Sequence, residues 1–164
     1  MYLVDGNNVM GQRVGWHQDR EGARRRLLKE LAELARIRKI RISVIFDGQP
    51  DRTFPDGSSY RGVRVYYARP GSDADSRLVE LVEGSRERKN LTVITSDRQL
   101  TARIRVNGVR VIRSGVFRHW VDDALESATR SDQAGMASPS GAEDPGDEEM
   151  SRWFRYFGVD PEDD

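Results

Sequence analysis

Apolar residues along the first 127 positions fall into two alternating patterns. Short runs rich in β-branched residues predict strands, at residues 2–5, 42–47, 63–67, 91–95 and 109–112. Longer stretches with apolar residues at helical spacing predict helices, at residues 20–38 and 73–88, around Leu100 and Ile104, and at 115–127. Strands that alternate with helices of this length are typical of right-handed βαβ units. We therefore predict an α/β fold, a three-layer α/β/α sandwich with a central, mostly parallel sheet.

The pattern changes after residue 128, so we predict one compact domain over residues 1–128, a length that can bury its own core. Residues 129–146 are rich in serine, glycine, alanine, proline and acids, and predict a disordered linker. Residues 147–164 predict a short helix and an acidic tail, and the helix carries Trp153, Phe154, Tyr156 and Phe157. A lone helix this short is marginal in water. We expect its rings to dock on the chain's own domain or on a partner, for example another subunit in an oligomer.

The composition excludes several classes of protein. The absence of cysteine excludes disulfides, thiolate catalysis and thiolate zinc sites. No run of about 18 apolar residues occurs, so we expect neither a transmembrane span nor a membrane partner. Strand-like residues begin at Met1 with no basic and apolar leader before them, so we expect no signal peptide and a cytoplasmic location.

The net charge of zero conceals an uneven distribution. From Glu143 to the end, nine acidic residues stand against Arg152 and Arg155, a charge of −7, so the first 142 residues carry +7. A basic domain suits a polyanionic partner, although an arginine-rich solvated surface explains the charge equally well. The acidic tail either shields the basic surface or only aids solubility.

Four aspartates are expected to meet at one place. Asp5 and Asp47 each end a predicted strand, Asp97 comes just after another, and the carboxyl ends of parallel strands share the edge where ligands bind. Asp75 falls in the first turn of a helix. Crowded carboxylates repel one another, and a divalent cation offsets that cost. Each acid also has a local explanation: an Asx-turn at Asp5, a turn at Asp47, an N-cap at Asp97 and the helix dipole at Asp75.

The donor set indicates the chemistry. Oxygen ligands without histidine or cysteine favour Mg²⁺ or Mn²⁺, and such ions promote displacement at phosphorus. Asn7 and Asn8 add neutral hydrogen-bonding groups beside Asp5. The chain has neither a G-x-x-x-x-G-K-[ST] loop nor a G-x-G-x-x-G fingerprint. We expect His17 and His119 to be packing or surface residues. Phosphoaspartyl hydrolases also begin with a strand followed by Asp-x-Asp. Here Asn7 replaces the second acid and cannot protonate a leaving group, so the sequence does not favour that class.

Four short motifs resemble a known family. Residues 2–9 (YLVDGNNV), 44–48 (VIFDG), 74–76 (ADS) and 93–98 (VITSDR) are similar, in order and spacing, to the YacP-like branch of the NYN domains, in the PIN-like superfamily. The resemblance covers roughly residues 1–127, and the aromatic segment 153–157 is similar to a C-terminal extension found in that group. It implies a PIN-like fold and a bacterial, Mg²⁺- or Mn²⁺-dependent endoribonuclease active in RNA decay.

The resemblance also implies roles for individual residues. The acidic site would consist of Asp5, Asp47, Asp75 and Asp97, which would be both catalytic and metal-binding, with Asn8 and Ser96 as polar support. Asp73 is explained by helix capping alone. The chain lacks the extra glutamate that many PIN nucleases carry on an early helix, a role that Asp47 could cover, so one or two metal ions remain possible.

The favoured hypothesis is hydrolysis of single-stranded RNA, with messenger RNA as the expected target. Candidate phosphate contacts are Arg13, Arg61, Arg69 and Arg98, and Ser96 is a further candidate RNA contact. Tyr66 or Tyr67 could stack a base or simply pack in the core. The alternatives are a non-catalytic RNA- or ribosome-binding adaptor with the same fold, and a nuclease that cleaves DNA.

Overall fold

The computed structural model of the chain describes residues 1–135, which contain a six-stranded sheet in the order β3-β4-β2-β1-β5-β6. Its strands are β1 (Tyr2–Asp5), β2 (Ile42–Phe46), β3 (Ser59–Tyr60), β4 (Val63–Tyr67), β5 (Thr92–Ile94) and β6 (Arg110–Ile112). Neighbouring strands are parallel, except that β3 runs antiparallel to β4 at one edge. The predicted α/β fold with a mostly parallel sheet is confirmed.

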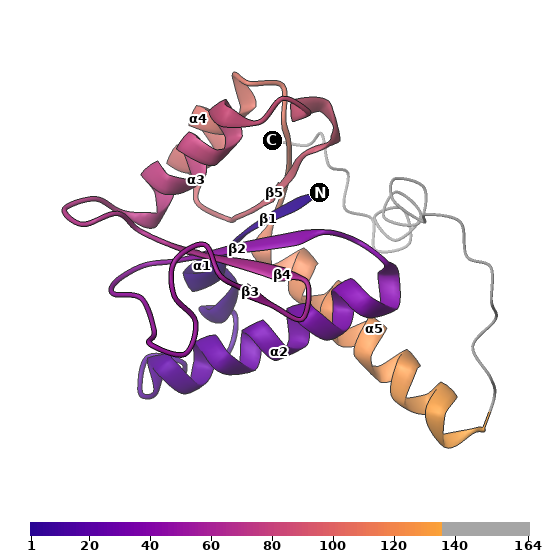
Figure 1. The fold of residues 1–164 in the computed structure, drawn as a ribbon. Helices are drawn as coiled ribbons and strands as arrows, with labels where there is room; N and C mark the ends of the chain where they lie inside the picture. Colours follow the sequence, from indigo (N-terminus) through magenta and orange to yellow (C-terminus); the bar gives the residue numbers. More distant parts are fainter. Residues whose placement is uncertain (136–164) are drawn as a thin grey trace.

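Helices cover both faces of this sheet. They are α1 (Gly6–Met10), α2 (Arg20–Arg38), α3 (Ala74–Gly84), α4 (Arg98–Arg105) and α5 (Ser114–Gln133), with a short 3₁₀ helix, η1, at Arg88–Asn90. The helices α2 and α5 lie on one face, below the sheet in Figure 1, and α3 and α4 lie on the other. The three layers that the sequence predicts are therefore present.

The core consists of two apolar layers that the central strands separate. Successive residues of a strand point to opposite faces, so Val4 and Val44 join the layer under α2 and α5, whereas Leu3 and Ile45 join the layer under α3 and α4. All residues of β1, β2 and β5 are buried, as expected for parallel strands covered on both sides. Asp5 alternates with Val4, and its carboxylate therefore lies on the α3–α4 side of the sheet edge.

The structure contains two short elements that were not predicted, and two helices end several residues from their predicted ends. The predicted loop after β1 begins with α1, and the loop after β2 contains β3. Helix α3 ends at Gly84 rather than at Arg88, because glycine is a poor helix former. Helix α5 continues to Gln133, aided by an Arg130–Glu126 ion pair one turn apart, so the first residues of the predicted linker are helical.

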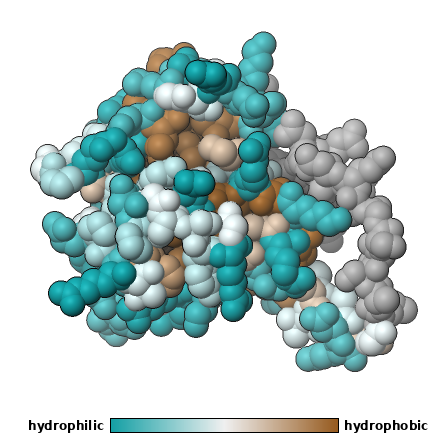
Figure 2. All heavy atoms as spheres, viewed as in Figure 1, coloured by the Kyte–Doolittle hydropathy of each residue, from teal (hydrophilic) through white to brown (hydrophobic). Residues whose placement is uncertain are grey.

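The rest of the predicted linker and the aromatic segment lie outside the described residues. The surface seen in Figure 2 is mostly hydrophilic, with hydrophobic side chains visible in a few hollows. None of the helices within residues 1–135 has both the length and the apolar character that crossing a bilayer requires.

Candidate active site

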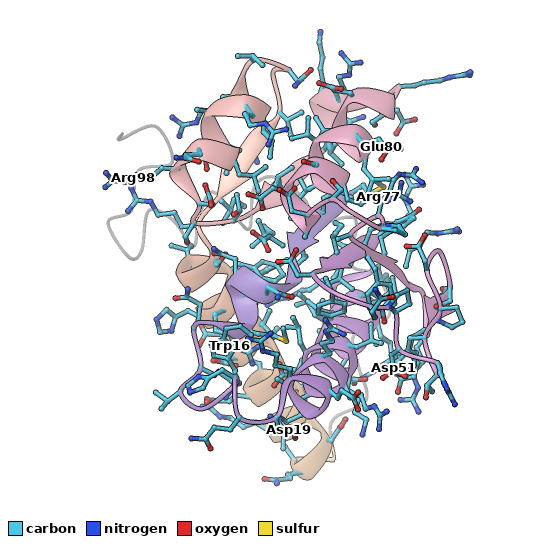
Figure 3. The ribbon with its side chains drawn as sticks, turned by 90° about the vertical axis from the view of Figure 1, so that its left-hand side faces the viewer. Trp16, Asp19, Asp51, Arg77, Glu80 and Arg98 are labelled. Carbon is cyan, nitrogen blue, oxygen red and sulfur yellow. The ribbon has the colours of Figure 1, made fainter. Side chains whose placement is uncertain are left out.

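The predicted aspartates gather at the carboxyl edge of the sheet. Strand β1 lies between β2 and β5, so the ends of these three strands are neighbours. Asp5 is the last residue of β1, Asp47 follows β2, and Asp97 follows β5 after two residues. Helix α3, which carries Asp75 in its first turn, is connected to the end of β2 by a hydrogen bond from the Ala74 amide to Asp47. Figure 3 is viewed from this edge.

Asp5 is the buried member of the group, with 6% of its surface exposed. Its Oδ1 accepts a hydrogen bond from the backbone N–H of Asn8 at 3.2 Å, which caps α1, and its Oδ2 accepts one from the hydroxyl of Thr95 at 2.9 Å. Burial raises the pKa of Asp5 to about 6; the hydrogen bonds from Thr95 and Asn8 oppose this, and the charges of Asp75 and Asp47 add to it. The fold therefore holds a carboxylate in a position that disfavours its charged form.

Asp75 is the second carboxylate with a raised pKa. Burial is the largest cause, and the charges of Asp97, Asp73 and Asp47 contribute, while Arg103 opposes them. The side chain is partly buried and makes no hydrogen bond or ion pair within residues 1–135. Asp75 is thus an acid without local compensation, close enough to the other acids for their charges to interact.

The remaining aspartates take part in the local structure. Asp97 Oδ1 accepts from the Leu100 amide at 2.9 Å and caps α4, and Asp73 Oδ1 accepts from the Ser76 amide at 2.7 Å and caps α3. Hydrogen bonds with the side chain and the backbone of Ser76 lower the pKa of Asp73. Asp47 Oδ1 accepts from the Ala74 amide at 2.9 Å. The predicted caps at Asp97 and Asp73 are therefore present. Asp97 and Asp47 each keep a second carboxylate oxygen that makes no hydrogen bond in the described part of the chain.

Asn8 and Ser96 belong to a hydrogen-bonded support for this edge. Asn8 Oδ1 accepts from the Ser96 amide at 2.9 Å and from the Ser114 hydroxyl at 2.6 Å. The Ser114 amide donates to Ser96 Oγ at 2.9 Å, which joins α5 to the loop after β5. Asn7 Oδ1 accepts from the Asp47 amide at 3.2 Å. The two asparagines therefore connect α1 to both neighbouring strands.

Sequence reasoning missed two residues of the site, Thr95 and Ser114. Thr95, which is 1% exposed, donates to Asp5 and accepts a hydrogen bond from the Asp97 amide at 3.1 Å. A hydroxyl directly after a buried strand, and two residues before Asp97, was the available signal for Thr95. No local signal marks Ser114, because its partner Asn8 lies 106 positions earlier.

The donor chemistry of the edge suits a hard divalent cation. All candidate ligands are carboxylates, which Mg²⁺ and Mn²⁺ prefer, and Asp5 and Asp75 have pKa values raised in part by their acidic neighbours. A cation would relieve this repulsion. In the conformation described for residues 1–135, however, no group of three His, Asp or Glu side chains is close enough to hold a metal ion together. The chemistry fits, but the side chains do not form a closed set of ligands.

Two of the four predicted phosphate-binding arginines are already paired. Arg13 donates to Glu30 at 3.3 Å and to Asp122 at 3.0 Å. Arg69 makes two hydrogen bonds to Glu80, at 2.9 and 2.6 Å. These contacts place Arg13 beside α2 and α5, and Arg69 beside α3.

The other two predicted arginines are available to a ligand. The guanidinium of Arg61 lies 5.4 Å from the ring centre of Tyr60, in the turn between β3 and β4. Arg98 follows Asp97 directly, is exposed, and makes no ion pair or hydrogen bond among the described residues. Arg98 is therefore the predicted phosphate contact that lies at the acidic edge, and Arg103, which the sequence did not single out, acts electrostatically on Asp75.

The two tyrosines serve packing. Tyr67 is 2% exposed, and its ring centre lies 6.0 Å from that of Phe46. Tyr66 is half-buried, and the guanidinium of Arg77 lies 5.3 Å from its ring centre. Neither histidine is buried.

Comparisons with known proteins agree with this architecture. Two crystal structures of Rae1 (YacP) from Bacillus subtilis, one of them a tryptophan-to-leucine mutant, resemble the chain with TM-scores of 0.66 and 0.64. Each is 21% identical, and each match covers 96% of this chain and 94% of the other, a likeness that shows the fold. No curated protein sequence matches the chain. The model of the YacP-like NYN domain matches residues 2–155. The chain therefore belongs to the YacP-like NYN domain family, within the PIN-like nuclease superfamily, and its function is RNA-related.

Proposed function

We propose that the protein is a metal-dependent endoribonuclease that hydrolyses phosphodiester bonds of single-stranded RNA, with messenger RNA as its target. The observation that supports this most directly is the state of Asp5. A buried carboxylate whose pKa is raised to about 6, in part by Asp75 and Asp47, is costly for the fold. Groups perturbed in this way, at the edge where α/β folds bind ligands, are typical of functional sites.

Mg²⁺ or Mn²⁺ would be held by Asp5, Asp75 and Asp97, with Asp47 binding directly or through water. Because no three of these side chains form a closed group, a few direct carboxylate contacts completed by waters fit the edge best, as is usual for Mg²⁺. The ion would activate water and neutralise charge on the phosphate.

The remaining polar groups have roles of their own. Thr95 fixes the orientation of the Asp5 carboxylate, because it holds Oδ2 at 2.9 Å. The Asn8 side chain is held through its Oδ1 by Ser96 and Ser114. Its Nδ2 makes no hydrogen bond within residues 1–135, and we assign it to a phosphate oxygen or a water. Arg98 would contact the phosphate backbone.

A second candidate function is a non-catalytic RNA- or ribosome-binding adaptor. One observation favours it: Asp5, Asp73 and Asp97 all cap helices, so the fold alone gives each of these acids a purpose. Such an adaptor would bind RNA with a steep salt dependence, and its affinity would not change with EDTA or with Asp5→Asn.

The deciding experiment measures cleavage of a fluorogenic single-stranded RNA with Mn²⁺, Mg²⁺ or EDTA, beside a DNA of the same sequence. We expect RNA cleavage that EDTA abolishes and that Asp5→Asn and Asp97→Asn each reduce at least about a hundredfold. Asp132→Asn, at an exposed position near the end of α5, is the matched control. Equal cutting by wild type and both site variants would point to a contaminant and contradict the proposal.

A further inference from the structure

A cavity of about 180 Å³ lies next to α1, the helix that follows Asp5. It is formed by the end of α1, the loop that follows, the first half of α2 and the start of α5. Its apolar walls include Met10, Trp16 and Leu27, and its charged lining includes Arg13, Arg26 and Glu30. None of the aspartates at the carboxyl edge lines it.

The size and walls of the cavity fit a single flat ring system. Pockets for drug-sized ligands measure about 300–1,000 Å³, so this cavity takes a smaller group. Trp16 is half-buried, and the guanidinium of Arg20 lies 5.7 Å from the centre of its ring. Proteins that bind single-stranded RNA stack unpaired bases on aromatic side chains of this kind.

One arginine of the cavity lining, Arg26, is able to bind an anionic group. Arg13, Arg26 and Arg118 line it against a single acid, Glu30. Arg118 donates to Glu30 at 2.6 Å and to Asp122 at 2.8 Å, and Arg13 donates to the same two carboxylates at 3.3 and 3.0 Å, so these four charges balance one another. Arg26 pairs with Asp19 only at 3.8 Å, and both side chains are exposed, which makes that contact weak. Arg26 can therefore exchange Asp19 for a phosphate at small cost.

The cavity also lies within reach of a strand bound at the acids. The hydrogen bond between Asn8 and Ser114 marks the carboxyl edge. Met10 follows Asn8 by two residues, and Arg118 follows Ser114 by one helical turn, about 6 Å. In Figure 3, Trp16 lies in the lower half and Arg98 in the upper half of the molecule viewed from the carboxyl edge. A nucleic acid strand along this surface would pass both.

We propose that this cavity binds one base of the single-stranded RNA whose backbone crosses the carboxyl edge. The base stacks on Trp16, and a phosphate beside it pairs with Arg26. The proposal rests on the proposed function, since it assigns part of the same substrate, but it concerns a binding site that is separate from the acids.

The test uses the full chain labelled with 5-fluorotryptophan, with Asp97→Asn, which we expect to suppress any cleavage of the probe. The chain has three tryptophans, and comparison with Trp16→Phe identifies the fluorine signal of Trp16. The probes are a short oligoadenylate and an abasic ribose-phosphate oligomer of the same length. We expect the Trp16 signal to move with the oligoadenylate and to stay with the abasic oligomer. The signal of Trp120, which is 5% exposed, should not move with either.

Three outcomes would overturn the proposal. Equal movement with both oligomers would mean that phosphates alone are bound. An unmoved Trp16 signal in protein saturated with oligoadenylate would mean that no base enters the cavity. Movement on deletion of residues 147–164, without any response to RNA, would assign the cavity to the chain's own aromatic segment.

Kinetics supply a second measurement. Trp16→Ala should raise KM for RNA cleavage about tenfold with little change in kcat, because stacking contributes to binding, and Trp16→Phe should restore KM. Unchanged KM in Trp16→Ala would contradict the proposal. A base-dependent Trp16 signal without cleavage by the wild type would support the cavity and contradict the nuclease function. RNA cleavage by the wild type without a base-dependent Trp16 signal would support the nuclease function and contradict the proposed role of the cavity.

Discussion

The hydroxyl of Thr95 donates a hydrogen bond to the Asp5 carboxylate at 2.9 Å, and this bond joins the ends of β5 and β1. The same hydroxyl accepts from the Asp97 amide at 3.1 Å. One buried side chain therefore connects two of the four candidate acids. It also offsets part of the penalty that burial imposes on the charged form of Asp5.

Replacing Thr95 tests this relationship. In Thr95→Val, Asp5 loses a hydrogen bond that lowers its pKa, so we expect this pKa to rise above its value of about 6. The free energy of unfolding should fall by about 1–3 kcal/mol, because polar groups lose partners in a buried place. Carboxyl NMR titration and thermal unfolding measure the two effects. Thr95→Ser keeps the hydroxyl and serves as the control. An unchanged Asp5 pKa in Thr95→Val would contradict the assignment.

The raised pKa of Asp5 also predicts how stability depends on pH without metal. The folded state holds this proton up to about pH 6, whereas the unfolded chain releases it near the ordinary carboxyl pKa of 3.8. The contribution of Asp5 to the free energy of unfolding is therefore complete below about pH 4. It is lost as pH rises through about 6, by up to about 3 kcal/mol.

The variant Asp5→Asn tests this dependence. We expect it to remove the loss, so that it unfolds at a higher temperature than the wild type at pH 8, but not at pH 4. Asp132→Asn should follow the wild type at both pH values, and identical curves for Asp5→Asn and the wild type would refute the assignment.

Asp47 allows its structural and functional roles to be separated. Its carboxylate accepts from the Ala74 amide, and its backbone is held by Asn7 and Arg24. Asp47→Asn keeps an acceptor for Ala74, so stability should change by less than about 0.5 kcal/mol, whereas Asp47→Ala should cost about 1 kcal/mol. Both should weaken Mn²⁺ binding, measured by calorimetry, if the side chain contributes charge to the ion. Unaltered Mn²⁺ affinity in both variants would exclude Asp47 from the metal site.

Arg98 and Arg69 form a matched pair for RNA binding. Arg98 is unpaired within residues 1–135, whereas Arg69 is held by Glu80, whose pKa is lowered to about 2 by hydrogen bonds from Arg69 and Arg77. We expect Arg98→Ala to weaken RNA binding and to reduce the salt slope by about one. Arg69→Ala should have the smaller effect. Fluorescence anisotropy in EDTA at several salt concentrations measures both, and a larger loss in Arg69→Ala would reverse the assignment.

The sheet and its acidic edge could be predicted because buried parallel strands leave continuous apolar runs. The end of each run marks the edge, which is how Asp47 and Asp97 were placed. Each acid had a local explanation from the sequence, an Asx-turn at Asp5 and a helix N-cap at Asp97, as the alternative to a place in the acidic group. For Asp5 and Asp97 both occur together, since each caps a helix and lies among the other acids.

Helix α1 and the role of Ser114 could not be predicted. Five residues from Gly6 to Met10 are too few to show helical periodicity, and the two asparagines are poor helix formers. The helix is instead stabilised by the Asp5 cap and by hydrogen bonds to distant parts of the chain. Pairing across such separations leaves no pattern in a single sequence.

The contacts of Asn8 have a consequence for biosynthesis. Its amide oxygen is bound by groups 88 and 106 positions further along the chain. Because the N-terminus is synthesised first, Asn8 can form both contacts only after Ser114 has emerged from the ribosome. The carboxyl edge of the sheet therefore acquires its final hydrogen-bonded support only when translation of the domain is nearly over.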